Sequence, residues 1–186
     1  MDVSNASMYD GATATAEAMF MAINVKKRNK ILISKTVNPN IIEVVRTYAK
    51  YKGIEVDLIE EREGVTSIED FKSKNSNDYA GVIIQSPNFY GIIEDLKDVR
   101  SILDETKGLF IMNSDISSLS ILKTPGEYGV DIADNFESVG QRPEMKGPSD
   151  ISSLLSNIKT KQMNVPTDTG VTPMKDGSTV SVQDLK

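Results

Sequence analysis

The residues best suited to chemistry lie in a polar loop, residues 5–16, that runs directly into an alanine-rich segment. A helix beginning near Gly11 directs unpaired backbone N–H groups and the positive end of its dipole at the preceding residues. Because helix N-termini bind anions, Ser7, Tyr9 and Asp10 are candidate ligand-binding residues. The structural alternative is a helix N-cap with Tyr9 packed against the fold. Since a carboxylate repels an anion, we expect Asp10 to cap the helix and Ser7 and Tyr9 to face the ligand or a partner.

Two further loops follow strand-like segments. The stretch QSPNFYGIIED, residues 85–95, places Asn88 and Tyr90 after an apolar strand, at the edge of a parallel sheet where open α/β folds bind ligands. A purely structural turn explains the same residues equally well. Asp115 follows the next strand, where it either holds a ligand or caps the turn that begins at Ile116, and capping is the favoured interpretation.

The composition excludes several classes of function. The chain of 186 residues has no His and no Cys, which removes the commonest general base, any thiolate nucleophile and zinc ribbons. A net charge of −6 without basic clusters argues against a nucleic-acid partner, and phosphate-loop and dinucleotide fingerprints are missing. No lysine stands in a context that marks a Schiff base. Five carboxylates are expected to be solvated surface groups rather than a metal site: Glu60, Glu61, Glu63, Glu94 and Asp95.

These loops need a framework, and apolar patterning between residues 12 and 133 predicts one. Short apolar runs alternate with segments of helical period, as in βαβ units with helices on both faces of a parallel sheet. Strands are predicted at 31–33, 54–59, 80–84 and 109–112, with 80–84 in a central position because it is continuously apolar. Helices are predicted at 13–27, from Pro39 to a stop at Gly53, around Ile68 and Phe71, and at 92–106.

The chain divides into an α/β domain, residues 1–134, and a second part, residues 135–186. Gly and Pro residues make the beginning of the second part a predicted linker, and its polar end a flexible tail. Between them a short helix is expected with an apolar stripe formed by Ile151, Leu154, Leu155 and Ile158. No apolar run reaches the ~20 residues that span a bilayer, and no signal or transit peptide is evident. A cytoplasmic protein without membrane contact is the default expectation.

Four sequence blocks resemble a known family. NASMYDGATA, RTYAKYKGIEV, PNFYGIIEDL and LKTPGEYGVDI occur in the order found in glycine dehydrogenase (decarboxylating), the P protein of the glycine cleavage system. The resemblance is to its subunit 1, or to the N-terminal half of the fused enzyme, and covers about residues 1–133. It implies part of the large domain of a fold-type-I pyridoxal-phosphate (PLP) transferase, with a mostly parallel sheet of roughly seven strands.

The same resemblance implies glycine decarboxylation with aminomethyl transfer to the lipoyl group of H protein. The PLP lysine belongs to subunit 2 or the equivalent half, so no lysine here inherits that role and no catalytic residue is assigned. Ser7, Tyr9, Asp10 and Asn88 are the residues expected to line the shared interface site. The family's glycine-rich GEGQ continuation is replaced by DNFES, residues 134–138, and the chain lacks the region preceding the first block. We therefore expect an oligomerising component that is inactive alone.

An alternative of another class keeps the fold without the chemistry. In that interpretation the chain is a non-catalytic α/β interaction module that binds a partner through the stripe in residues 151–158.

Overall fold

The computed structural model describes residues 8–135. Its α-helices are α1 (Gly11–Lys26), α2 (Pro39–Lys52), α3 (Ile68–Lys74) and α4 (Lys97–Thr106). Its strands are β1 (Lys30–Ser34), β2 (Glu55–Ile59), β3 (Glu61–Arg62), β4 (Val65–Thr66), β5 (Tyr79–Ser86), β6 (Leu109–Ser114) and β7 (Ile132–Asn135). Two 3₁₀ turns, η1 (Ile116–Ser120) and η2 (Pro125–Tyr128), connect β6 to β7.

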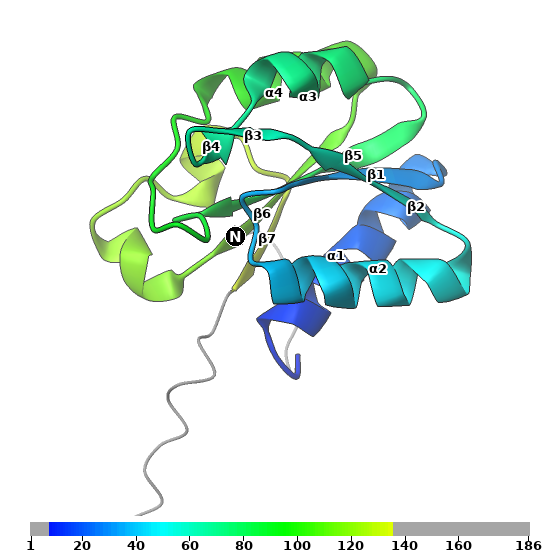
Figure 1. Cartoon of the computed structure of the whole chain (residues 1–186), viewed down its shortest axis with the longest axis horizontal. Coiled ribbons are helices and arrows are strands. Elements are labelled where there is room, and N and C mark those ends of the chain that lie inside the picture. Colours follow the sequence, from blue (N-terminus) through cyan, green and yellow to red (C-terminus); the bar gives the residue numbers. More distant parts are fainter. Residues whose placement is uncertain (1–7, 136–186) are drawn as a thin grey trace, which may run out of the picture. The chain divides into compact units, whose positions relative to one another are not determined.

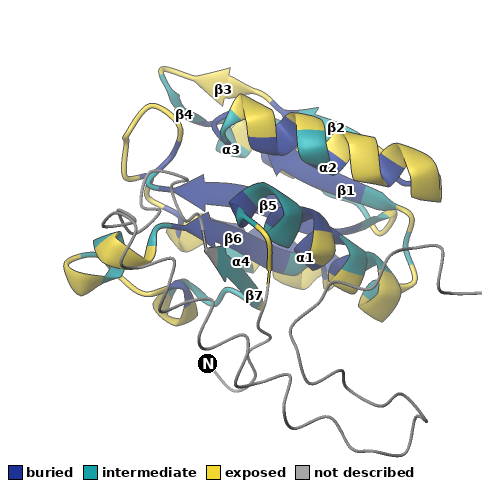
Figure 2. Ribbon diagram, turned by 90° about the horizontal axis from the view of Figure 1, so that it is seen from below, coloured by how far each residue is buried: buried dark blue, intermediate teal, exposed yellow. Residues whose placement is uncertain are grey.

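The main sheet has the strand order β2-β1-β5-β6-β7, and every pairing is parallel. Helices α1 and α2 cover one face and α3 and α4 the other, which gives three layers (Figure 1). The buried strands lie between helices whose outer surfaces are exposed (Figure 2). The predicted α/β class and the central position of β5 are confirmed.

Successive side chains on each strand point to opposite faces of the sheet, so the hydrophobic core is divided between the two faces. On β1, Ile31 and Ile33 pack with α1 and α2, whereas Leu32 packs on the opposite side with α3 and α4. The centre of the sheet also requires a glycine, because a Cβ at Gly81 would lie 2.1 Å from the Leu109 carbonyl oxygen. Successive strands therefore meet closely in the middle of the sheet, and their carboxyl ends share one edge.

Helix boundaries follow local signals, with one correction. The second helix begins at Pro39 behind the N-cap Asn38 and ends at Gly53, whose φ of 64° is left-handed, as predicted. The helix predicted over residues 92–106 begins only at Lys97. The helical spacing of the preceding apolar residues was misleading because Ile93 is 55% exposed and contributes to no buried stripe.

Three elements were not anticipated from the sequence. These are the β3–β4 hairpin, the η2 turn and the edge strand β7, which is too short to show a period. Within residues 8–135, none of the helices combines the length and apolar character needed to cross a membrane. Ser7 and the predicted stripe at 151–158 lie outside the described residues, and the division after residue 134 remains a prediction.

Candidate functional site

The candidate site is the edge of the sheet at which the parallel strands end. The loops after β1, β5 and β6 meet there, and the N-terminus of α1 lies against β6 and β7 (Figure 1). All the loop residues singled out from the sequence that the structure describes belong to this edge, because parallel strands direct their following loops to the same side.

Asp10 caps α1, as predicted. Its Oδ1 atom accepts a hydrogen bond of 2.7 Å from the Thr13 backbone N–H, and the Thr13 hydroxyl lies 3.2 Å from the Asp10 backbone N–H. This reciprocal capping box satisfies donors that an anion would otherwise bind. Tyr9 is 93% exposed, so the alternative of a packed Tyr9 is wrong and its ring is available to another molecule.

Asn88 is 4% exposed and organises the loop after β5. Its Nδ2 atom donates to the Gly64 carbonyl oxygen at 2.7 Å and to Glu94 Oε1 at 2.8 Å. Its Oδ1 atom accepts from the Tyr90 and Ile92 backbone N–H groups, each at 3.0 Å. Both polar atoms are thus fully used inside the protein, which is the geometry of the structural turn.

Glu94 departs from the expectation of a solvated carboxylate. It is 5% exposed and accepts hydrogen bonds from Asn88 and, at 2.9 Å, from the Thr66 backbone N–H. The side chain therefore ties the β5 loop to β4 of the hairpin. Two partners for a buried carboxylate account for its burial, because each N–H offsets part of the desolvation cost.

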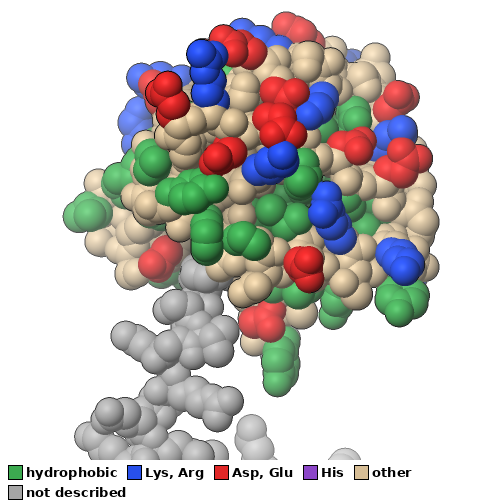
Figure 3. Space-filling model, viewed as in Figure 1, with side chains coloured by type: hydrophobic (Ala, Val, Ile, Leu, Met, Phe, Trp, Pro, Cys, Tyr) green, Lys and Arg blue, Asp and Glu red, His purple; other side chains and the backbone are tan. Residues whose placement is uncertain are grey.

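The loop held by Asn88 and Glu94 presents apolar side chains outward. We call Phe89, Tyr90, Ile92 and Ile93 the edge-loop patch; they are 51%, 53%, 36% and 55% exposed. Hydrophobic side chains gather on the side of the molecule toward which the strands point (Figure 3). A hydrogen bond to Glu61 raises the pKa of the Tyr90 phenol. Neighbouring apolar side chains held in place this way are typical of a contact surface for another protein.

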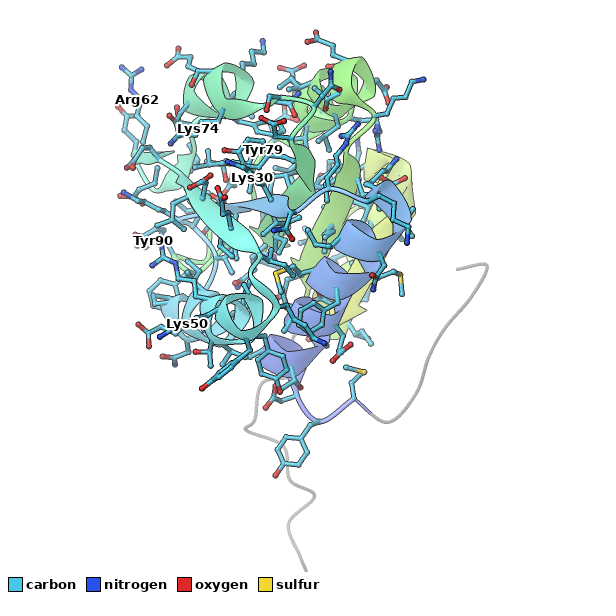
Figure 4. All side chains as sticks on the ribbon, turned by 90° about the vertical axis from the view of Figure 1, so that its right-hand side faces the viewer. Lys30, Lys50, Arg62, Lys74, Tyr79 and Tyr90 are labelled. Atoms are coloured by element: carbon cyan, nitrogen blue, oxygen red, sulfur yellow. The ribbon has the colours of Figure 1, made fainter. Side chains whose placement is uncertain are left out.

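At the opposite ends of the strands the polar groups pair with one another. Tyr79 and Lys30 lie close together there, while Tyr90 lies at the outer boundary of the molecule (Figure 4). Burial and a hydrogen bond to Asp57 raise the pKa of Tyr79 to about 12. Lys30 pairs with Glu55 at 2.6 Å. These contacts join neighbouring strands and leave the carboxyl edge as the candidate site.

A buried polar cluster at the same edge was missed from the sequence. Asn113 on β6 and Asp134 on β7 are directly opposite in the parallel register, and both contact Thr15 on α1. The residue selected from the sequence at this position was the neighbouring Asp115. The sequence could have indicated Asn113, because side chains two residues apart on a strand point to the same face. Ile111 faces α1, and Asn113 therefore does so too.

The remaining candidates have structural roles. The Asp115 side chain caps η1 through the Ser117 backbone N–H at 2.9 Å, which confirms the favoured interpretation. Asp95 pairs with Lys97 at 2.9 Å on the surface. Among residues 8–135 there is no group of three or more acidic side chains able to hold a metal ion.

This parallel sheet with its loop-built carboxyl edge is the large-domain architecture of fold-type-I PLP enzymes. A crystal structure of glycine decarboxylase (P-protein) in inhibitor-bound form matches with a TM-score of 0.70 and 35% identity, over 78% of this chain and 33% of that one. A putative O-acetylhomoserine (thiol)-lyase from Campylobacter jejuni, crystallised with a pyridoxyl-lysine phosphate, shares the fold with a TM-score of 0.51 at 12% identity. The match covers 68% of this chain and 30% of that one.

The sequence matches the glycine cleavage system P-protein family over residues 1–142. A probable glycine dehydrogenase (decarboxylating) subunit 1 from Listeria innocua is 44% identical over 147 residues, which are 79% of this chain and 33% of that protein. The chain therefore belongs to the glycine cleavage system P-protein family, and it spans about a third of the length of the curated relatives that it matches.

The fold family implies PLP, whose phosphate requires N–H donors or cationic side chains. At the start of α1 the Asp10 carboxylate already occupies the helix N-terminus. Lys35, which directly follows β1, forms an ion pair of 2.5 Å with Glu60. Both of these positive sites are therefore already matched by a carboxylate of this chain and do not fit the phosphate group.

Proposed function

We propose that this chain provides the subunit 1 part of a glycine dehydrogenase that decarboxylates glycine and transfers the aminomethyl group to the lipoyl arm of H protein. The observation that carries the proposal is the P-protein family match over residues 1–142. The subunit 1 relatives imply a second P-protein subunit, and we place the PLP lysine on that partner. A cytoplasmic location belongs to the same proposal.

In this proposal the residues of this chain hold the loops that face the partner subunit in a fixed conformation. PLP held by the partner supplies the electron sink for loss of carbon dioxide. Asn88 and Glu94 fix the β5 loop, so the edge-loop patch meets the partner with little loss of conformational entropy. Asp10 fixes the start of α1 and leaves Tyr9, together with Ser7 outside the described residues, to face the shared site.

Binding to a purified lysine-bearing subunit 2, followed by sedimentation velocity, tests the docking surface. We expect a complex with the unaltered chain and at least tenfold weaker binding with Ile93→Asp, because a charge would be buried in the edge-loop patch. Val25→Asp is the matched control, since Val25 is 63% exposed on α1 and outside the patch. Equal weakening by both substitutions, or by neither, would contradict this docking surface.

The cofactor assignment has its own experiment. The chain is mixed with PLP, reduced with borohydride and digested, and the labelled peptides are identified by mass spectrometry. We expect weak labelling dispersed over several lysines, because the proposal places the Schiff-base lysine on the partner subunit. One lysine labelled stoichiometrically would show that this chain carries the cofactor itself.

A further inference from the structure

The cluster formed by Thr15, Asn113 and Asp134 has an unusual pattern of used and unused atoms. Asn113 Nδ2 donates to Asp134 Oδ1 at 2.5 Å and to Thr15 Oγ1 at 2.9 Å. The Thr15 hydroxyl is 2.8 Å from the Gly11 carbonyl oxygen and 3.2 Å from Asp134 Oδ1. Two enclosed oxygens remain without a hydrogen-bond partner: Asn113 Oδ1 and Asp134 Oδ2.

These two oxygens belong to groups already joined by one hydrogen bond. A primary amide offers an N–H donor beside a carbonyl acceptor, and a protonated carboxyl group offers the complementary O–H and C=O. An ionised Asp134 can only accept, which leaves both enclosed oxygens without a donor and therefore destabilises the folded state. A single proton on Oδ2 would satisfy both atoms together.

A proton also suits the space and the charges around Asp134. A bound water or cation requires volume, whereas the two oxygens are enclosed and a proton requires none. Within residues 8–135, β7 packs against β6, which has no ionisable side chain, and against α1. The ionisable residues of α1 are the exposed Glu17 and, in its last turn, Lys26. Asp10 at the helix start is engaged in its cap, and Asp131 before β7 pairs with Arg100 at 2.7 Å.

We propose that the folded protein holds Asp134 protonated, with the side chain closing a two-hydrogen-bond pair with Asn113 that clamps β7 to β6 beside α1. The N–H of Asn113 is donated to Asp134 Oδ1, and the O–H on Asp134 Oδ2 is donated to Asn113 Oδ1. Loss of the proton breaks one bond and places a negative charge on an enclosed carboxyl group, so the edge strand loosens at higher pH.

The direction of the pH effect follows from linkage. Burial raises the pKa of Asp134 from 3.8 to about 7, against the opposing effect of its hydrogen bonds to Thr15 and Asn113. A carboxyl group whose pKa is raised in the folded state stabilises the fold fully below its unfolded pKa and loses that contribution as pH rises through the folded pKa. With these two pKa values, the folding equilibrium constant falls roughly 100-fold between pH 5 and pH 8.

Urea denaturation of the full chain at pH 5 and pH 8 tests the pair, with Asp134→Asn as the decisive variant. An asparagine at this position retains both hydrogen bonds and cannot ionise, so the 100-fold loss should disappear from the variant. Asp78→Asn is the matched control, since Asp78 is exposed and its substitution should leave the loss unchanged. The same loss with pH in the unaltered chain and in Asp134→Asn would overturn the proposal.

A measurement on the unaltered chain decides the question even if Asp134→Asn fails to fold. The carboxyl carbons of ¹³C-labelled aspartate are followed by NMR between pH 3 and pH 9. We expect one aspartate signal, that of Asp134, to titrate near pH 7. Ionisation of every aspartate below pH 5 would overturn the proposal.

Discussion

Two buried asparagines at the same edge of the sheet differ in how completely their hydrogen bonds are made. Asn88, after β5, uses its amide nitrogen twice and its oxygen twice. Asn113, at the end of β6, uses its nitrogen twice while its oxygen has no partner. The same residue type therefore forms a closed network in the loop after β5 and an incomplete one on the neighbouring strand β6.

The two asparagines therefore have different roles at this edge of the sheet. A closed network stabilises one loop conformation, so Asn88 and Glu94 act as a rigid support for the edge-loop patch. An incomplete network depends on something added, and in the Asn113 cluster the smallest addition is a proton. Substitutions in both clusters test whether the two asparagines differ in this way.

The largest effect is expected for Asn88→Ala. Loss of the amide removes one hydrogen bond from the buried Glu94 carboxylate and leaves the Tyr90 and Ile92 backbone N–H groups without their acceptor. This should cost about 3 kcal/mol of unfolding free energy. Urea denaturation at pH 6 measures the loss. Asn40→Ala at an exposed position of α2 is the control and should change stability by less than about 0.5 kcal/mol. A loss at Asn88 no larger than that of the control would contradict the closed network.

Asn113→Ala should cost less, about 1–2 kcal/mol at the same pH, because it removes side-chain hydrogen bonds only and leaves no backbone group unpaired. The same denaturation experiment ranks the two asparagines directly. If Asn113→Ala proves more damaging than Asn88→Ala, the Asn113 cluster is the main support of the edge and the contrast is reversed.

Asp10→Ala should cost about 1 kcal/mol through loss of the α1 cap. Asp10→Asn is the matched control, since asparagine caps helices equally well and should retain nearly full stability. Thermal unfolding of the three proteins under identical conditions gives the ranking. Equal destabilisation by Ala and Asn would mean that the charge at this position matters more than the cap.

Tyr9→Phe should have the smallest effect on stability, within about 0.5 kcal/mol, because the side chain is 93% exposed. Its expected effect is on function, as reduced glycine decarboxylation when the substitution is placed in a glycine dehydrogenase assembled with its lysine-bearing partner. Release of labelled carbon dioxide from carboxyl-labelled glycine measures it. Full activity with Tyr9→Phe, together with lost activity but normal stability with Asp10→Ala, would exchange the roles proposed for the two residues.

Local residue patterns were sufficient to predict most of the framework. The helix from Pro39 to Gly53 and the Asp10 cap depend on backbone geometry within a few residues, so type and spacing specify them. The helix predicted from residue 92 begins only at Lys97. The apolar residues before it have helical spacing, but spacing does not show whether a side chain such as Ile93 is buried in the fold.

The alternation of strands and helices, the central position of β5 and the family were all predictable from the order of the amino acids. Which polar side chains meet at the carboxyl edge became known from the three-dimensional fold. Asn88 reaches Gly64 across 24 residues, and Asn113 faces Asp134 across 21. Such contacts depend on the register between parallel strands, which backbone pairing and helix packing set over the whole sheet, and no local pattern encodes it.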